Sequence, residues 1–129
     1  MKYIYSAIFT QDDEKIVARV PDLPGCVTSG SNIADAIAMA TDAASMLLVY
    51  MEDNGLEIPP AANQADIPHS ADDIFSLIQV DTLAYRAQTD TRAVRKNVSL
   101  PHWMAALADR RGINCSQVLQ QGLLRQFDA

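Results

Sequence analysis

The sequence is short of the residues that most often build catalytic and metal centres. Among its 129 residues there are two cysteines, Cys26 and Cys115, which form neither a CxxC pair nor a metal-binding spacing. The two histidines, His69 and His102, lie far apart in the sequence. We interpret the cysteines as reduced thiols, and we expect no metal, no cofactor and no enzymatic activity.

Long apolar runs are missing as well. No run approaches the roughly 18 residues that a membrane-spanning helix needs. The N-terminal segment, residues 1–10, is short and is followed by polar residues, which argues against a secretory signal peptide. We therefore expect a soluble, cytoplasmic protein.

Basic residues are scarce in the first part of the chain, and acidic residues are scarce in the last. Residues 1–90 hold four basic and fourteen acidic residues, a balance of −10, whereas residues 91–129 hold six basic and two acidic residues, a balance of +4. Such asymmetry predicts two modules with different partners. The acidic module would repel nucleic acid, and the basic module would attract it.

The N-terminal module combines short alternating segments with one long helical pattern. Asn32 precedes the helix as an N-cap, with Asp35 three residues on as in a capping box, and Asn54 and Gly55 end it. Residues 57–73 contain three prolines and are expected to form a loop. The pattern predicts an α+β module with a helix on one sheet face, in the order βββαβ, with strands at 2–10, 15–20, 26–29 and 74–80.

The C-terminal module has the clearest pattern, a strand followed by two short helices. Residues 94–100 alternate, and Pro101 ends this strand and opens a helix that closes at Gly112. Asn114 then caps a second helix, with Gln117 completing a capping box. So small a module cannot bury a sufficient core alone, and its strand has no partner within the module.

Two copies of this module would remove both deficiencies. Antiparallel pairing of the strands gives a two-stranded ribbon, which fits the major groove of DNA. The face of the ribbon opposite the core carries Arg95, Asn97 and Ser99, and Arg and Asn side chains can each read a base by two hydrogen bonds. The amide groups at the start of the second helix, near Asn114 and Ser116, would clamp a phosphate.

The C-terminal module resembles the ribbon-helix-helix family. Residues 95–101, Arg-Lys-Asn-Val-Ser-Leu-Pro, match the strand and closing proline of that family, and residues 112–117 match its turn into the second helix. The resemblance implies that Arg95, Asn97 and Ser99 read bases. Ser99 stands where a basic residue is frequent, which should weaken affinity or narrow the readout. Lys96 stands where an apolar residue is usual, so the start of the ribbon is expected to fray.

The N-terminal module resembles the HicB antitoxins. The run at 21–30, Pro-Asp-Leu-Pro-Gly-Cys-Val-Thr-Ser-Gly, carries the resemblance, and it is followed as in that family by Ala-Asp-Ala at 34–36 and Gly-Leu-Glu-Ile-Pro-Pro at 55–60. Residues 81–101 also resemble a HicB subgroup. Order and spacing are both kept.

This resemblance implies a truncated RNase H-like fold for residues 1–81. The polar residues 82–93 are expected to form a linker, and residues 94–129 a ribbon-helix-helix domain for DNA binding and dimerisation. The resemblance also implies an antitoxin that occludes HicA, a small basic ribonuclease that cleaves messenger RNA using a histidine, and that represses its own operon by binding operator DNA. The assembly would be a homodimer or a dimer of dimers. The acidic balance of residues 1–90 agrees, because an acidic surface can occupy a basic RNA-binding site.

Two other functions stay open at the level of sequence. One is a ligand-sensing ribbon-helix-helix transcriptional regulator without a toxin partner, although no ligand motif is evident. The other is a metal-dependent nuclease, which needs several carboxylates converging on ions about 3.5–4 Å apart. The first strand offers no carboxylate, and Asp12, Asp13 and Glu14 are expected in a turn, so the nuclease is disfavoured.

Four single residues have a structural interpretation beside a functional one. Cys26 follows a Pro-Gly turn and is interpreted as a buried thiol rather than a nucleophile. Cys115 lies in the first turn of a helix, where the dipole lowers a thiol pKa, but a redox switch is the less common role. His102 is interpreted as an exposed first-turn residue rather than a phosphate contact, and Trp103 as part of a dimer core rather than a base-stacking group.

Overall fold

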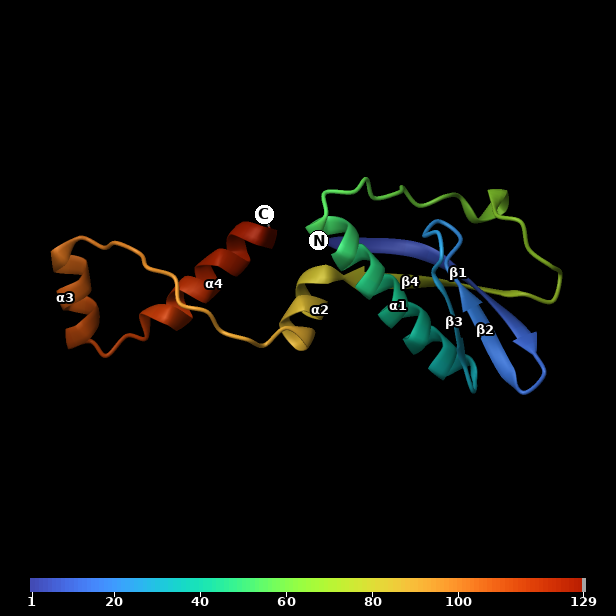
Figure 1. The fold of residues 1–129 in the computed structure, drawn as a ribbon, viewed down its shortest axis with the longest axis horizontal. Helices are drawn as coiled ribbons and strands as arrows, with labels where there is room; N and C mark the ends of the chain where they lie inside the picture. Colours follow the sequence, from blue (N-terminus) through green and yellow to red (C-terminus); the bar gives the residue numbers. More distant parts are fainter. Residues whose placement is uncertain (129) are drawn as a thin grey trace. The chain divides into compact units, whose positions relative to one another are not determined.

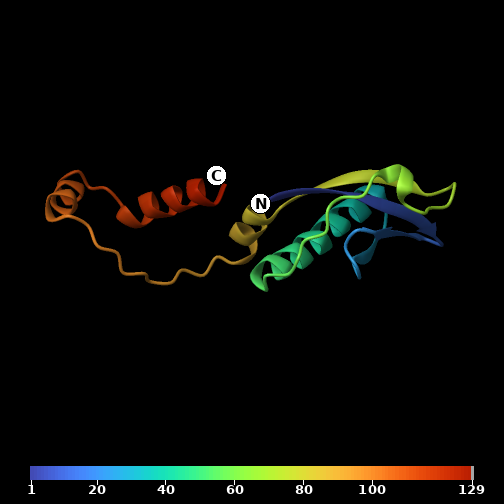
Figure 2. The ribbon, with the colours of Figure 1, turned by 90° about the horizontal axis from the view of Figure 1, so that it is seen from above.

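The computed structural model describes residues 1–128 and divides the chain into two compact units, one of residues 2–91 and one that begins at Arg92. Figures 1 and 2 show the elements of both. The first unit is a two-layer structure in which one long helix lies along a sheet, as the view from above shows most clearly (Figure 2). The second unit contains two helices.

The sheet of the first unit has four antiparallel strands in the order β3-β2-β1-β4 (Figure 1). β1 is central: it pairs with β4 from Lys2 to Phe9 and with β2 from Ile8 to Asp12. This arrangement confirms the α+β class and the predicted βββαβ order. The elements are β1 (Lys2–Asp12), β2 (Lys15–Arg19), β3 (Val27–Gly30), α1 (Ile33–Asp53) and β4 (Ile74–Asp81).

The first hairpin is tighter than the sequence predicts. β1 continues to Asp12, so the turn consists of Asp13 and Glu14 alone instead of residues 11–14. Asp13 takes a positive φ of 54°, a conformation that tight hairpin turns commonly require and that Asp tolerates better than most residues. The turn therefore projects consecutive acidic residues from the end of the sheet.

The helix α1 begins and ends where the sequence predicts. Asn32 caps it, because its Oδ1 accepts a hydrogen bond of 2.8 Å from the Asp35 amide. The Asp35 carboxylate accepts from the Ser31 amide at 2.9 Å, so the capping box closes one residue earlier than expected. After the helix, Gly55 takes the left-handed conformation with φ 63°, which is the usual way for a helix to stop.

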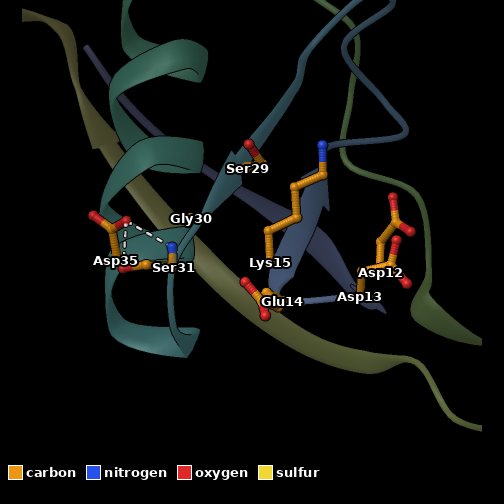
Figure 3. A pocket seen from close by; sticks show the side chains of 8 residues that line it. All are labelled: Asp12, Asp13, Glu14, Lys15, Ser29, Gly30, Ser31 and Asp35. Carbon is orange, nitrogen blue, oxygen red and sulfur yellow. Dashed lines mark hydrogen bonds between the residues drawn. The ribbon is translucent and has the colours of Figure 1, made fainter.

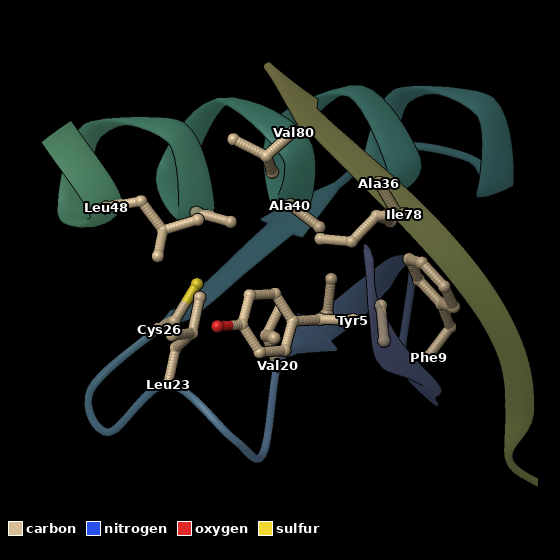
Figure 4. Close-up of a cluster of buried hydrophobic side chains, with 13 residues drawn as sticks. Tyr5, Phe9, Val20, Leu23, Cys26, Ala36, Ala40, Leu48, Ile78 and Val80 are labelled. Atoms are coloured by element: carbon tan, nitrogen blue, oxygen red, sulfur yellow. The ribbon is translucent and has the colours of Figure 1, made fainter. Parts of the chain in front are cut away.

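The hydrophobic core lies between α1 and the sheet (Figure 4). Alternate residues of β1 face every fourth residue along α1. All of them are buried: Tyr5, Ala7 and Phe9 on β1, and Ala36, Ala40, Ala44 and Leu48 on α1. The alanines let the helix approach the sheet closely. The approach is close at Gly30, where an added Cβ would lie 2.4 Å from the Ala36 nitrogen.

The length and apolar composition of α1 would by themselves allow it to cross a membrane. Core helices share both properties, and one side of α1, with Ala36, Ala40, Ala44 and Leu48, is buried on the sheet. One such helix does not indicate a membrane protein.

The predicted loop after α1 packs against the sheet. The Tyr5 hydroxyl donates to the Pro59 carbonyl at 2.6 Å, and the Ala62 amide donates to the Asp22 carboxylate at 3.1 Å. Further on, Ile67 is buried with 5% exposure. The loop also contains a single 3-10 turn, η1 (Gln64–Asp66), that the sequence does not predict.

Residues 82–93, expected from the sequence to be a linker, include an ordered helix, α2 (Thr82–Thr89), which belongs to the first unit. Asp81 caps it, since its Oδ1 accepts from the amides of Leu83 and Ala84 at 3.1 and 3.2 Å. The segment without helix or strand begins only at Asp90.

The second unit contains the two predicted helices, α3 (His102–Arg110) and α4 (Cys115–Asp128). Gly112 ends the first with φ 63°. Residues 90–101 hold no helix and no strand. The strand predicted at 94–100 is thus not formed in the single chain, because a strand needs a partner for its backbone hydrogen bonds and the unit supplies none.

Candidate partner-binding and DNA-binding surfaces

The three residues predicted to read bases lie in the segment that precedes α3. Arg95, Asn97 and Ser99 are all exposed, in a stretch without secondary structure. In the single chain these three side chains are therefore accessible to DNA. They are not aligned on one face of a strand, because no strand forms there. Their arrangement as a set stays a prediction that depends on a second chain.

The predicted phosphate clamp lies at the start of α4. The Asn114 side chain accepts a hydrogen bond from the Gln117 amide at 3.2 Å, which confirms the predicted cap. Ser116 is exposed in the first turn of the helix. The positive end of the helix dipole is thus open to solvent beside these two residues.

The second unit has no core of its own. None of the residues 92–128 is buried, although many are apolar. Val94 is 89% exposed, Trp103 63% and Phe127 55%. Exposed apolar surface on this scale is typical of an interaction site.

An acidic rim surrounds a hollow at one end of the first unit (Figure 3). The turn of the first hairpin and the first turn of α1 contribute the carboxylates of Asp12, Asp13, Glu14 and Asp35. Lys15 is the basic residue among those lining the hollow. Ser29 and Gly30 of β3 line it between the two groups of carboxylates.

A second hollow, which we call the β3–α1 groove, lies between the start of β3 and the exposed side of α1. Its exposed apolar side chains are Val27, Met39, Met46 and Tyr50. From the sequence, α1 is favoured as a cover for the sheet over a partner-binding helix, although its exposed side could serve both roles. The signal lies in the spacing, because these α1 residues recur at helical intervals on a flank of the helix beside the buried alanines.

Glu52 gathers hydrogen bonds from β1 and α2 at the end of α1. Its carboxylate accepts from the hydroxyls of Tyr3 at 2.7 Å and Thr82 at 3.0 Å, and from the Arg86 guanidinium at 3.1 Å. Arg86 also pairs with Asp53 at 2.9 Å. This cluster, which the sequence did not predict, anchors α2 to the first unit.

The Glu52 cluster shifts the pKa values of its members in opposite directions. Burial alone would raise the pKa of Glu52, but the hydrogen bonds from Tyr3, Arg86 and Thr82 outweigh it and lower that pKa below its usual value. Burial, together with the neighbouring Glu52 carboxylate, raises the pKa of Tyr3 to about 12. The native cluster therefore holds a carboxylate and a neutral phenol.

The described residues offer little for catalysis. Among residues 1–128, no group of three or more His, Cys, Asp and Glu side chains is placed to hold a metal ion. Burial raises the pKa of the Cys26 thiol, which is the opposite of what a nucleophilic thiolate needs. His69 packs edge-on against Phe75, and its Nδ1 lies 2.9 Å from the Ile67 carbonyl oxygen, which is a structural role.

Comparison with known proteins gives one family. The family described as "HicB_like antitoxin of bacterial toxin-antitoxin system" matches residues 5–125. No curated protein matches the chain.

Several solved structures have a similar fold. A toxin–antitoxin complex from Streptococcus pneumoniae has a chain that is 22% identical, with a TM-score of 0.59 and coverage of 98% of this chain and 99% of that one. The antitoxin HicB of Burkholderia pseudomallei is 24% identical, with a TM-score of 0.52 and coverage of 99% and 97%. A chain of the HicA3 and HicB3 toxin–antitoxin complex is 22% identical, with a TM-score of 0.52 and coverage of 61% and 99%.

Proposed function

The chain belongs to the HicB-like antitoxin family of bacterial toxin–antitoxin systems, and from this premise we propose that it neutralises a HicA-type ribonuclease and represses its own operon. The family match over residues 5–125 carries the proposal, since it spans both units. Members of this family are generally not catalytic. The chain would act by binding a toxin with one unit and operator DNA with the other.

Toxin neutralisation is assigned to the first unit. Its sequence carries a strong excess of acidic residues, and a ribonuclease needs a basic surface to hold RNA. An acidic protein surface seated on that basic surface excludes RNA both by bulk and by charge. Toxin–antitoxin complexes among the solved structures of similar fold support a toxin partner.

Repression is assigned to the second unit. Its apolar residues have no cover in the single chain, and two copies would cover them by pairing residues 94–100 as antiparallel strands. The resulting ribbon would present Arg95, Asn97 and Ser99 to base edges in the major groove. The amides at the start of α4, beside Asn114 and Ser116, would hold a phosphate and so fix the position of the ribbon.

The finer fold assignments belong to the same proposal. The four-stranded sheet with α1 on one face supports a truncated RNase H-like domain. The order of an extended segment, α3 and α4 supports a ribbon-helix-helix domain. Pairing of that domain makes the protein a homodimer or a dimer of dimers.

Co-expression with the neighbouring gene tests the proposed function. The short open reading frame beside this gene is expressed alone and together with this chain, and growth is followed. The toxin is expected to arrest growth, and this chain is expected to restore it. A harmless neighbour, or toxicity that this chain does not relieve, would overturn the antitoxin proposal and leave a DNA-binding regulator as the better account.

A further inference from the structure

We propose that the toxin docks on one strip of the first unit, formed by the β3–α1 groove and the acidic rim that continues it. Apolar side chains of the toxin would fill the groove, and its basic side chains would meet the rim. This inference rests on the proposed function, because the occupant is a small basic toxin.

The apolar end of the strip is exposed to water without an evident structural reason. Met39 is 41% exposed, Met46 58%, Tyr50 58% and Val27 62%, whereas the core-facing side of α1, from Ala36 to Leu48 at every fourth residue, is buried. Methionine adapts its shape to a partner, and tyrosine is enriched at protein interfaces. The groove thus has the composition of a docking site, and burying it would supply most of the binding free energy.

The groove and the acidic rim are continuous along the same two elements. Residues 27 and 28 of β3 line the groove, and residues 29 and 30 of the same strand line the hollow inside the rim. On α1, Asp35 belongs to the rim and Asp42 to the groove. A partner that covers one of the two surfaces would therefore lie against the other.

The charges of the strip select a basic occupant. Asp12, Asp13, Glu14 and Asp42 form no ion pair within residues 1–128. A basic protein would neutralise them, and it would be steered to the groove before contact. A second copy of this unit would bring the same uncompensated carboxylates face to face, which is unfavourable.

β3 adds a geometric reason for docking here. It is an edge strand of the sheet, as β4 is at the other side, and among the described strands it pairs only with β2, but of the two edges it is the one that borders the groove. An outer strand offers backbone hydrogen bonds to an extended segment of a partner. A toxin segment lying in the groove would run beside this edge.

The opposite face of the sheet is the natural control surface. Ile4 is 52% exposed and Leu77 61%, so that face is also apolar in part. A third hollow lies between the start of β1 and the end of β4. It is lined by Lys2, Tyr3, Ile4, Gln79, Val80 and Asp81, of which only Asp81 is a carboxylate. If exposed apolar area alone decided where the toxin binds, the two faces would be equally good sites. The carboxylates of the strip favour the strip, because the toxin is basic.

The test measures binding of full-length variants to the toxin encoded beside this gene, purified with its catalytic histidine replaced. Met46→Lys is expected to weaken binding at least about tenfold, because it removes an apolar contact and places a positive charge against a basic partner. The matched control is Leu77→Lys, which makes the same kind of change at a residue of similar exposure, 61% against 58%. It is expected to bind as the wild type does.

A second pair of variants tests the charge argument. Asp42→Lys and Asp72→Lys change the net charge equally, and both residues are exposed, but only Asp42 lies in the strip. Asp42→Lys is expected to weaken binding several-fold at low salt and less at high salt, because salt screens exposed charges. Asp72→Lys should bind within about twofold of the wild type, since Asp72 lines neither the groove nor the hollow inside the rim, and exposed charges outside a contact matter little.

Hydrogen exchange on the wild-type complex locates the contact surface without any substitution, so its result does not depend on whether a variant folds. Toxin binding is expected to protect amides of residues 27–30 and 39–50 more than those of β4. Two results would overturn the docking site and leave the antitoxin function intact. One is that the wild type binds the toxin while the strip amides stay unprotected. The other is that Met46→Lys and Leu77→Lys lose affinity equally. Protection of the strip by self-association without toxin would show a second copy there and would also overturn it. A wild-type chain that does not bind the toxin at all would overturn the proposed function itself.

Discussion

The Arg86 guanidinium donates to the Glu52 carboxylate at 3.1 Å and so joins α2 to the last turn of α1. The same carboxylate accepts from Tyr3 and Thr82, so one acidic side chain links β1, α1 and α2. The segment that leads to the second unit begins directly after α2. The cluster thus holds α2, the last helix of the first unit, against α1 and β1.

Removing the Glu52 carboxylate should destabilise the first unit. Glu52→Ala abolishes three hydrogen bonds to a half-buried charge, and we expect a loss of about 1–3 kcal/mol in the free energy of unfolding. Urea denaturation measures it. The matched control is Glu57→Ala, an exposed residue with no hydrogen bond or ion pair in the described chain, which should change stability by no more than about 0.5 kcal/mol. Equal losses in both variants would contradict the role of the cluster.

The cluster also predicts how stability depends on pH. The folded state lowers the Glu52 pKa, so its contribution is present above the usual glutamate value of about 4.3 and is lost as the pH falls through the lower folded value. The folded state raises the Tyr3 pKa to about 12, so that contribution is complete below about 10 and is lost as the pH rises toward 12. Unfolding free energies measured across pH should fall at both ends. Glu52→Gln should reduce the loss of stability at acid pH, and Tyr3→Phe should reduce the loss at alkaline pH. If either variant leaves the corresponding loss unchanged, other groups cause it.

Gly30 should not tolerate a side chain. An added Cβ would lie 2.4 Å from the Ala36 nitrogen and 2.7 Å from its Cα, and helix backbone cannot move aside cheaply. We expect Gly30→Ala to cost about 3 kcal/mol, the upper end of the usual cost of overpacking. Thermal or chemical unfolding measures it. Ser29→Ala, at the exposed neighbouring position in β3, is the control and should be close to neutral; a stable Gly30→Ala would show that α1 can shift away from β3.

Arg95 should contribute directly to operator binding. Arg95→Ala is expected to lose about 1–3 kcal/mol of specific binding, which is the usual worth of a bidentate base contact. Gel shift or fluorescence anisotropy on the operator measures it. The control is Arg125→Ala, which removes the same charge from the same unit near the end of α4. It should weaken binding to specific and to non-specific DNA about equally. Unchanged operator affinity in Arg95→Ala would contradict the ribbon.

Trp103 should report dimerisation of the second unit. It is the only tryptophan in the chain, and it is 63% exposed in the single chain. Pairing of two copies should bury it, so its fluorescence should be shifted to the blue at high concentration and return toward the red on dilution. Leu123→Lys, on the apolar face of α4, should give the red-shifted spectrum at all concentrations. A spectrum that is red-shifted and independent of concentration in the wild type would contradict a dimer core at Trp103.

Much of the first unit follows from local signals. Alternation of apolar residues predicts the strands, and the ends of α1 follow from Asn32 and Gly55. These features depend on short-range sterics and hydrogen bonds, which a few neighbouring residues determine. The Glu52 cluster could not be predicted in this way, because Tyr3 and Glu52 are 49 positions apart and meet only when α1 lies on the sheet.

The sequence by itself determined the βββαβ order, the two C-terminal helices and the division of charge between the two parts of the chain. Only the tertiary structure decided that residues 82–89 belong to the first unit, that Gly30 has no room for a side chain, and that a groove with Met46 lies next to an acidic rim. The reason is that local conformation depends on neighbouring residues, whereas a surface is created by segments that the fold brings together. The strand predicted at 94–100 follows from neither, because its backbone hydrogen bonds would require a second chain.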